Sequence, residues 1–167
     1  MGMKSEMIRD LFQSQEMARK KYLRPQFLEL GLTVGQGQPR ILANLQKYGP
    51  QTQRKLSDLC HLDVTTMSRT LDRMEAAGLL AREDNPSCRR SYLICLTPLG
   101  EEKARRVQEI FLRYEELLRD SLTEEECGAL CGALQKITDR LLSEAARQEE
   151  QQSSISSVPS ARRPPRP

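Results

Sequence analysis

The spacing of the apolar residues changes from a helical period to strict alternation just after Gly78, and this change limits the chain's possible folds more than any other feature. Before it, two short helical patterns are joined by only His61-Leu62-Asp63. After it, residues 80–83 and 91–96 have the pattern of two β-strands, separated by a polar turn. A helix-turn-helix followed directly by a β-hairpin is a winged helix. The predicted fold class is therefore mainly α with a small β-hairpin wing.

The two helices before the change have clear start signals. Thr52 is a suitable N-cap for the first, and Asp63 is one for the second, which we expect over residues 64–77 with Gly78 closing it. An inward face is predicted for the second helix from apolar residues spaced three, four and three apart: Val64, Met67, Leu71 and Met74. This spacing leaves a polar outer face of Thr65, Thr66, Ser68, Arg69 and Arg73.

Amphipathic helices flank the winged helix on both sides. Residues 6–23 have a helical apolar pattern, which Pro25 is expected to break or kink before a short helix that ends at Gly31. A further helix is expected from Pro39 to about Tyr48. After the hairpin, Thr97-Pro98 begins a long helix.

The last helix is predicted to begin at the capping box Thr123 to Glu126 and to end near Arg147. Residues 148–167 are polar and rich in Pro and Ser, which predicts a disordered tail. The prediction is one domain over residues 1–147, with a winged helix-turn-helix DNA-binding lobe at 33–97. Residues 5–32 and 98–147 are its dimerisation helices, because their apolar stripes exceed what the lobe can cover.

The composition argues against an enzyme. The chain has a single histidine, His61, and no nucleophile is placed to use it. Cys127 and Cys131 lack the second ligand pair of a metal site, and no glycine-rich phosphate loop is present, so we expect neither metal nor cofactor. The longest apolar run, residues 92–96, is far short of the roughly 20 residues of a membrane helix. The start of the chain lacks a signal peptide, and five cysteines close no disulfide framework, which favours the cytoplasm.

Duplex DNA is the partner that the winged helix predicts. The candidate contacts are polar side chains on the outer helix face, at the start of the preceding helix and at the hairpin tip: Thr52, Gln53, Thr65, Thr66, Ser68, Arg69, Arg73, Arg89 and Arg90. The alternative is an ordinary solvated surface, and Arg73 could instead pair with Asp72 or Glu75 or brace the wing. Residues 51–97 carry seven basic and six acidic side chains, so their net charge does not distinguish a DNA contact from a solvated surface. Only the positions of the charged side chains can do so.

The five cysteines differ in what their positions predict. Cys60 is expected in the core and Cys95 within a strand, and Cys127 and Cys131 are expected to be small buried residues of the last helix. Cys88 lies at the hairpin tip beside two arginines that would lower its pKa. It is therefore the candidate for a redox-active thiol, which would give an alternative reading of the chain as a redox-responsive regulator.

The segment LDRMEAAGLLAREDNPSCRRSYLICLTPLGEE, residues 71–102, resembles the multiple-antibiotic-resistance regulator (MarR) family of bacterial transcription factors. GLT at 31–33, GP at 49–50 and TMSRTLDR at 66–73 also fit its pattern. The resemblance implies a homodimeric regulator that represses transcription from a pseudo-palindromic operator and is released by a small aromatic effector. Residues 63–77 would enter the major groove and the wing the minor groove. One departure is Cys88, which stands where the family has an aspartate that holds Arg90. A winged helix used only to bind another protein is the remaining alternative.

Overall fold

The computed structural model describes residues 2–33, 35, 37–88 and 90–156. The chain divides into two compact units, residues 1–116 and residues 117–167, and each is described by itself. The predicted division into a DNA-binding lobe and dimerisation helices stays a prediction.

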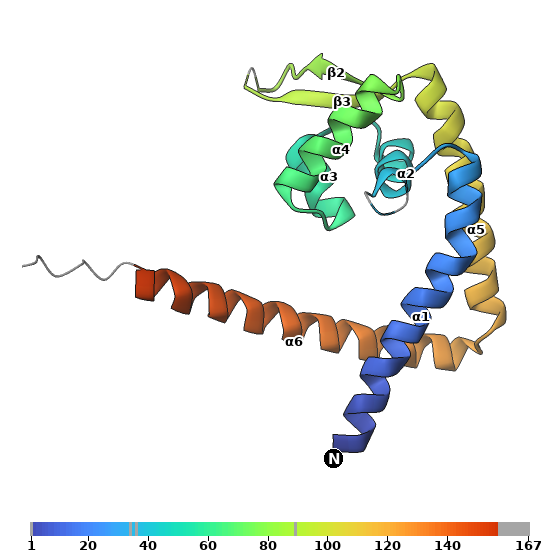
Figure 1. Cartoon of the computed structure of the whole chain (residues 1–167), viewed down its shortest axis with the longest axis vertical. Coiled ribbons are helices and arrows are strands. Elements are labelled where there is room, and N and C mark those ends of the chain that lie inside the picture. Colours follow the sequence, from blue (N-terminus) through green and yellow to red (C-terminus); the bar gives the residue numbers. More distant parts are fainter. Residues whose placement is uncertain (1, 34, 36, 89, 157–167) are drawn as a thin grey trace, which may run out of the picture. The chain divides into compact units, whose positions relative to one another are not determined.

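The first unit contains a winged helix between two long helices (Figure 1). Its elements, in chain order, are α1 (Gly2–Glu29), α2 (Gln38–Tyr48), β1 (Gln51–Thr52), α3 (Gln53–Cys60), α4 (Val64–Ala76), β2 (Leu80–Asp84), β3 (Tyr92–Leu96) and the greater part of α5 (Pro98–Asp120). The mainly helical class with a hairpin wing is confirmed, and the helix-turn-helix boundaries agree with the prediction to within one residue.

The wing is part of a three-stranded antiparallel sheet in the order β1-β3-β2. Strand β2 pairs with β3 from Leu80 opposite Leu96 to Asp84 opposite Tyr92. Strand β1 adds Gln51 opposite Ile94 and Thr52 opposite Leu93. The sequence did not predict β1, because two residues are too few to show an alternating pattern.

One apolar core joins the long helices to the winged helix within this unit. Its buried side chains come from α1 through α5: Leu23, Phe27, Leu32, Ile41, Leu42, Leu45, Leu56, Cys60, Met67, Leu71, Met74, Leu79, Leu80, Ile94, Ala104, Val107 and Ile110. Cys60 is buried, as predicted, and Cys95 lies in β3, as predicted, and is buried as well. The core sets the orientation of α4 and the hairpin together, since both contribute to it.

The predicted break of the first helix at Pro25 is wrong, because α1 continues through this residue to Glu29. A proline inside a helix costs about 3 kcal/mol. Leu23 and Phe27 lie on either side of Pro25 and are both buried in the core, so their packing offsets that cost. The helix ends as predicted at Gly31, which has a left-handed φ of 72°.

Helices α1 and α5 lie side by side in the first unit (Figure 1). The rings of Phe27 and Phe111 meet edge to face with centroids 5.4 Å apart. Lys103 Nζ donates a hydrogen bond to the carbonyl oxygen of Leu30 at 2.7 Å, which satisfies a free carbonyl at the end of α1.

The second unit contains the end of α5 and the long helix α6 (Glu124–Ser156). The predicted capping box is confirmed: Thr123 N–H donates to Glu126 Oε2 at 2.9 Å, and Glu126 N–H donates to Thr123 Oγ1 at 3.3 Å. The bonds that the Thr123 N–H and, at 2.9 Å, the Thr123 hydroxyl donate to Glu126 Oε2 hold the pKa of this carboxyl below its usual value. The helix continues well past its predicted end near Arg147. The rest of the predicted tail, residues 157–167, lies outside the described residues.

The predicted burial of Cys127 and Cys131 is wrong, because both side chains are exposed on α6. The leucines of the same helix, among them Leu130 and Leu141, are exposed as well. The helical spacing correctly showed an apolar face, but the described residues of the second unit leave that face uncovered. In the part of the chain that the structure describes, none of the helices combines the length and apolar character needed to cross a lipid bilayer.

Candidate nucleic-acid interface

Helix α4 presents its start and its polar face to solvent. Asp63 caps the helix, since its Oδ1 accepts a hydrogen bond from Thr66 N–H at 2.8 Å and its Oδ2 accepts one from Thr66 Oγ1 at 2.6 Å. These bonds from Thr66 hold the pKa of Asp63 below its usual value. The Thr66 hydroxyl is therefore engaged as a donor and remains available to a ligand only as an acceptor.

The other predicted contact residues of α4 are accessible. Thr65, Arg69 and Arg73 are exposed, and Ser68 is half-buried. The predicted inward position of Val64 is wrong, because 67% of this residue is exposed. Thr70 takes a buried place in the core-facing stripe instead. Its hydroxyl donates to the carbonyl oxygen of Thr66 at 2.8 Å, which is how a polar side chain is accommodated there.

The sequence pattern assigned Val64 to the core, but its exposure makes it a candidate apolar contact with DNA. Val64 is the first residue of α4 and is not among the residues that this helix buries. An apolar side chain at the start of a helix in the major groove can contact the methyl group of thymine. Only the burial of each position, and not the spacing, separates this residue from Met67.

The start of α3 is the second predicted contact region. Thr52 pairs with Leu93 in the sheet, and its Oγ1 accepts a hydrogen bond from Lys55 N–H at 3.3 Å. Thr52 and Gln53 are both half-buried. His61 ends the helix in the left-handed region at φ 51° and is exposed.

The wing tip is ordered by Asn85 and Ser91, which the sequence pattern did not single out. Asn85 Nδ2 donates to Ser91 Oγ at 2.8 Å, and Asn85 Oδ1 accepts a hydrogen bond from Ser87 N–H at 3.0 Å. Arg90 is exposed and forms no ion pair with any carboxylate that the structure describes, so Asp84 does not replace the aspartate that the family pattern has at position 88. The predicted contact residue Arg89 lies outside the described residues.

Cys88 is exposed at this tip, and its pKa is lowered. The main cause is a hydrogen bond from the Ser91 side chain, followed by one from the backbone N–H of Arg90. The predicted cause was the charge of Arg89 and Arg90; Arg90 acts here through its backbone N–H, and Arg89 lies outside the described residues. A redox role for Cys88 stays a prediction.

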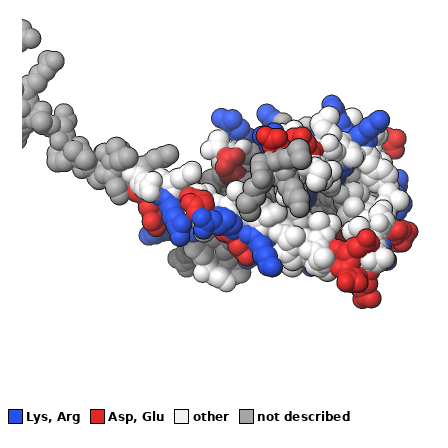
Figure 2. Space-filling view, turned by 90° about the horizontal axis from the view of Figure 1, so that it is seen from below, with Lys and Arg blue, Asp and Glu red and all other residues white. Residues whose placement is uncertain are grey.

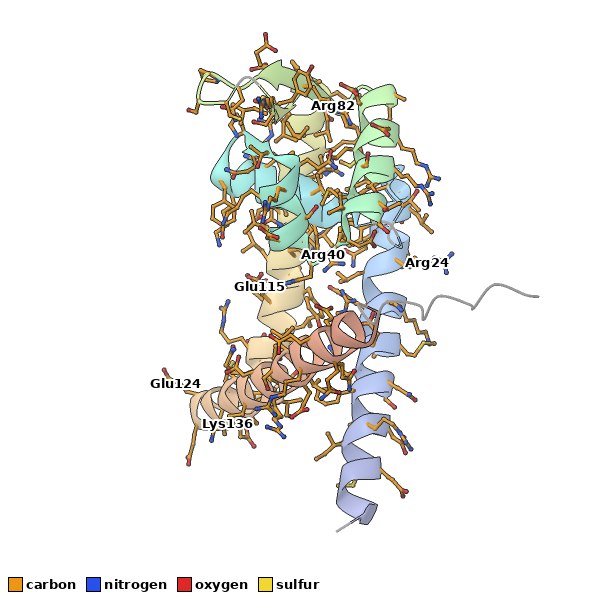
Figure 3. All side chains as sticks on the ribbon, turned by 90° about the vertical axis from the view of Figure 1, so that its left-hand side faces the viewer. Arg24, Arg40, Arg82, Glu115, Glu124 and Lys136 are labelled. Carbon is orange, nitrogen blue, oxygen red and sulfur yellow. The ribbon has the colours of Figure 1, made fainter. Side chains whose placement is uncertain are left out.

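Arg82 connects the wing to α4. The sequence pattern had offered Arg73 as a residue that could brace the wing. Arg82 lies on β2 beside α4 (Figure 3). Its Nη2 lies 2.6 Å from Asp72 Oδ1, and its Nη1 pairs with Glu75 Oε2. Arg73, by contrast, is exposed to solvent.

The junction between the winged helix and α5 depends on Thr97 and Gly100. Thr97 Oγ1 donates to the carbonyl oxygen of Gly78 at 2.6 Å and accepts from Gly100 N–H at 3.0 Å. Thr97 N–H donates to the carbonyl oxygen of Leu79 at 3.1 Å. A Cβ at position 100 would lie 2.0 Å from that same oxygen. The Leu-Thr-x-x-Gly pattern therefore joins the end of α4 to α5.

A groove along α1, which we call the α1 groove, has an apolar floor and a cationic rim. Leu23, Phe27 and Phe111 lie among its lining residues. The charged lining includes Arg24 and Lys20 of α1 and Arg40 of α2, together with Glu16, whose carboxylate lies 3.3 Å from Lys20 Nζ; Figure 3 labels the two arginines. Its volume is 1170 Å³, which is ample for a ring-sized molecule.

The net charge does not define the interface. Figure 2 shows basic and acidic side chains intermixed on the face drawn there. The formal charge of the whole chain is only +3. A nucleic-acid contact therefore depends on the positions of the exposed arginines of α4 and the wing, and not on the net charge.

The arrangement of α2, α3, α4 and the hairpin defines a winged helix-turn-helix protein. Residues 35–92 match the model of the MarR family. Over this segment, which is about a third of the chain, the protein is similar to the MarR family.

The curated relatives that the chain matches are described as transcriptional regulators. The chain is 33% identical over 87 residues to the HTH-type transcriptional regulator YxaD of Bacillus subtilis, which is 52% of this chain and 61% of the relative. It is 26% identical over 108 residues to a putative regulatory protein for the hcr operon of Thauera aromatica, which is 64% of this chain and 63% of the relative. The chain thus spans about three fifths of the length of these curated relatives.

Solved structures share the fold. MepR of S. aureus in its DNA-binding conformation superposes with a TM-score of 0.72 at 23% identity, over 80% of this chain and 98% of MepR. The MepR–DNA complex superposes with a TM-score of 0.70 at 24% identity, over 78% of this chain and 95% of that one. At this level of identity the likeness shows the fold alone.

Proposed function

We propose that this protein is a DNA-binding transcriptional regulator that acts as a homodimer and represses promoters by covering a pseudo-palindromic operator in the cytoplasm. The observation that carries the proposal is the exposed polar face of α4, held beside an arginine-tipped hairpin by the ion pairs of Arg82. An α-helix fits the major groove, and a hairpin can reach the neighbouring minor groove.

Each contact residue has a role in this proposal. Arg69 donates two hydrogen bonds to a guanine edge, and Thr65 and Ser68 contact neighbouring base edges or phosphates. Arg73 lies further along the same exposed face and contacts a phosphate. Arg90, together with Arg89, enters the minor groove, where the potential is most negative. The backbone N–H groups at Thr52 and Gln53 contact a phosphate at the start of α3.

A second copy of the chain supplies the other half of the operator contact. The described part of α1 exposes Met7, Ile8, Leu11 and Phe12, and α6 exposes Leu130, Leu134, Leu141 and Leu142. Exposed apolar faces of this size are typical of interfaces between subunits. A two-fold dimer would place two α4 helices about one DNA turn apart, on the order of 10 base pairs.

Selection of bound fragments from genomic DNA tests the proposal. We expect the enriched sequences to share a two-fold symmetric motif, and the affinity for that motif to fall steeply as salt rises. Sedimentation of the protein should give twice the chain mass. A slope near zero for log affinity against log salt would favour a winged helix that binds another protein, and a monomer in solution would contradict the dimer.

The α1 groove supports a second element of the proposal, release by a small effector. Its apolar floor and cationic rim suit a small aromatic acid. We expect benzoate-class acids to raise the Tm of the protein and to weaken operator binding, provided that they favour a dimer whose α4 helices are wrongly spaced. The Arg24→Gln/Arg40→Gln variant should lose the shift in Tm, measured by differential scanning fluorimetry. If the variant shifts as the parent does, the groove is not the effector site.

A further inference from the structure

We propose that Arg82 is the positioning residue that fixes the wing against the recognition helix α4, so that the two elements contact DNA as one rigid unit. This inference rests on the proposed DNA-binding function. It assigns a role in DNA binding to a residue that contacts α4 and not the DNA itself. The cluster consists of Arg82 on β2 and of Asp72 and Glu75 on α4, and we call it the Arg82 clamp.

The geometry of the clamp suits a bridge between two elements. Asp72 and Glu75 are three residues apart on α4 and so lie on neighbouring turns of one face. One arm of the guanidinium reaches each carboxylate, Nη2 to Asp72 at 2.6 Å and Nη1 to Glu75. A planar guanidinium can hold two acceptors in a fixed relation, which an ammonium cannot do.

The clamp acts on the whole hairpin because of where Arg82 stands. It is the middle residue of β2 and pairs with Ile94 of β3, whose side chain is buried in the core. The side chain of Arg82 is only 26% exposed, whereas Asp72 and Glu75 are 61% and 40% exposed. The arginine is thus packed between hairpin and helix, and any swing of the hairpin away from α4 would have to break both ion pairs.

Positioning, rather than stability, is what such a cluster supplies. Ion pairs with partners this exposed contribute little to the free energy of unfolding. A two-element contact with DNA, however, needs both elements at the right mutual angle before binding, and freedom in that angle lowers affinity. Arg82 should therefore affect DNA affinity far more than Tm.

If the role of Arg82 were purely electrostatic, the Asp72→Asn/Glu75→Gln variant would be expected to show the opposite change in DNA affinity. Asp72 and Glu75 place negative charge on the helix that approaches the phosphates. If Arg82 only neutralised them, the Asp72→Asn/Glu75→Gln variant would bind DNA more tightly than the parent. If the clamp positions the wing, the same variant loses both ion pairs and binds more weakly in spite of its more favourable charge.

The test compares operator titrations of the parent, Arg82→Gln, Asp72→Asn/Glu75→Gln and Arg106→Gln. We expect the first two variants to bind about tenfold more weakly, with a Tm within a few degrees of the parent. Arg106 forms an exposed ion pair with Glu109 on α5, and its variant should match the parent. Parental or tighter binding by Asp72→Asn/Glu75→Gln would overturn the proposal.

A measurement without DNA separates this inference from the proposed function. Hydrogen exchange of the amides of residues 80–96 should be faster in both clamp variants than in the parent or in Arg106→Gln. Unchanged exchange overturns the clamp whether or not the protein binds DNA. If instead the exchange rises but the parent shows no salt-dependent binding to DNA, the clamp exists and the regulator function fails.

Discussion

Gly100→Ala is expected to destabilise the first unit by about 3 kcal/mol. The added Cβ would lie 2.0 Å from the carbonyl oxygen of Leu79 and 3.0 Å from its carbonyl carbon. These are backbone atoms, so they cannot rotate away as the end of a side chain could. The higher helix propensity of alanine returns only about 1 kcal/mol.

The backbone at Leu79 has little room to yield. Its carbonyl oxygen accepts a hydrogen bond from Thr97 N–H, and Thr97 Oγ1 donates to the neighbouring carbonyl oxygen of Gly78. Relieving the overlap would break this junction between α4, the wing and α5. We expect Tm to fall by about 6–12 °C, measured by circular dichroism at the helical signal.

Gly35→Ala is the matched control for this prediction. Gly35 has no heavy atom within 4 Å of an added Cβ and no left-handed φ. Its variant should remain within about 0.5 kcal/mol of the parent. A Gly100→Ala protein as stable as Gly35→Ala would show that α5 begins further from Leu79 than described here.

Arg69→Ala is expected to weaken operator binding by about 1–3 kcal/mol, or roughly 5- to 150-fold, and to relax the preference at one base pair. Arg69 is exposed on the face of α4 turned away from Met67 and Leu71, so its loss removes a contact without opening the core. Titration of the selected operator and of its single-base variants measures both effects. The Tm should stay close to that of the parent.

Arg90→Ala is expected to behave differently on the same set of operators. Arg90 is exposed at the wing tip and has no described carboxylate partner, so its charge is available to the DNA. Its loss should weaken binding evenly across sequences and reduce the salt slope by about one. If both variants titrate operator DNA as the parent does, the contact residues are wrongly assigned. Loss of preference at a single base pair in Arg90→Ala, rather than in Arg69→Ala, would exchange their roles.

The sequence by itself determined the local features of this protein. The N-caps at Thr52 and Asp63 and the capping box at Thr123 depend on hydrogen bonds three residues apart, so neighbouring residues suffice to predict them. The change of period after Gly78 predicted the hairpin, because side-chain spacing follows directly from strand and helix geometry. The winged-helix class followed from the order of these elements.

Tertiary structure alone decided which positions are buried and which distant groups meet. Spacing assigned Val64 to the core together with Met67, but Val64 is 67% exposed whereas Met67 is fully buried. Pro25 lies within a continuous helix because core contacts on both sides of it offset its cost. Cys127 and Cys131 lie on an apolar face that the second unit itself leaves uncovered.

The Arg82 clamp and the Gly100 junction also could not be predicted from sequence spacing, because each joins residues of different elements. Arg82 meets Asp72 and Glu75 only because the hairpin folds back beside α4, whereas the sequence pattern offered Arg73 as their partner. Gly100 must lack a side chain because Leu79, 21 positions earlier, passes against it. Sequence patterns record the period of each element, whereas contacts between elements depend on how the whole core packs.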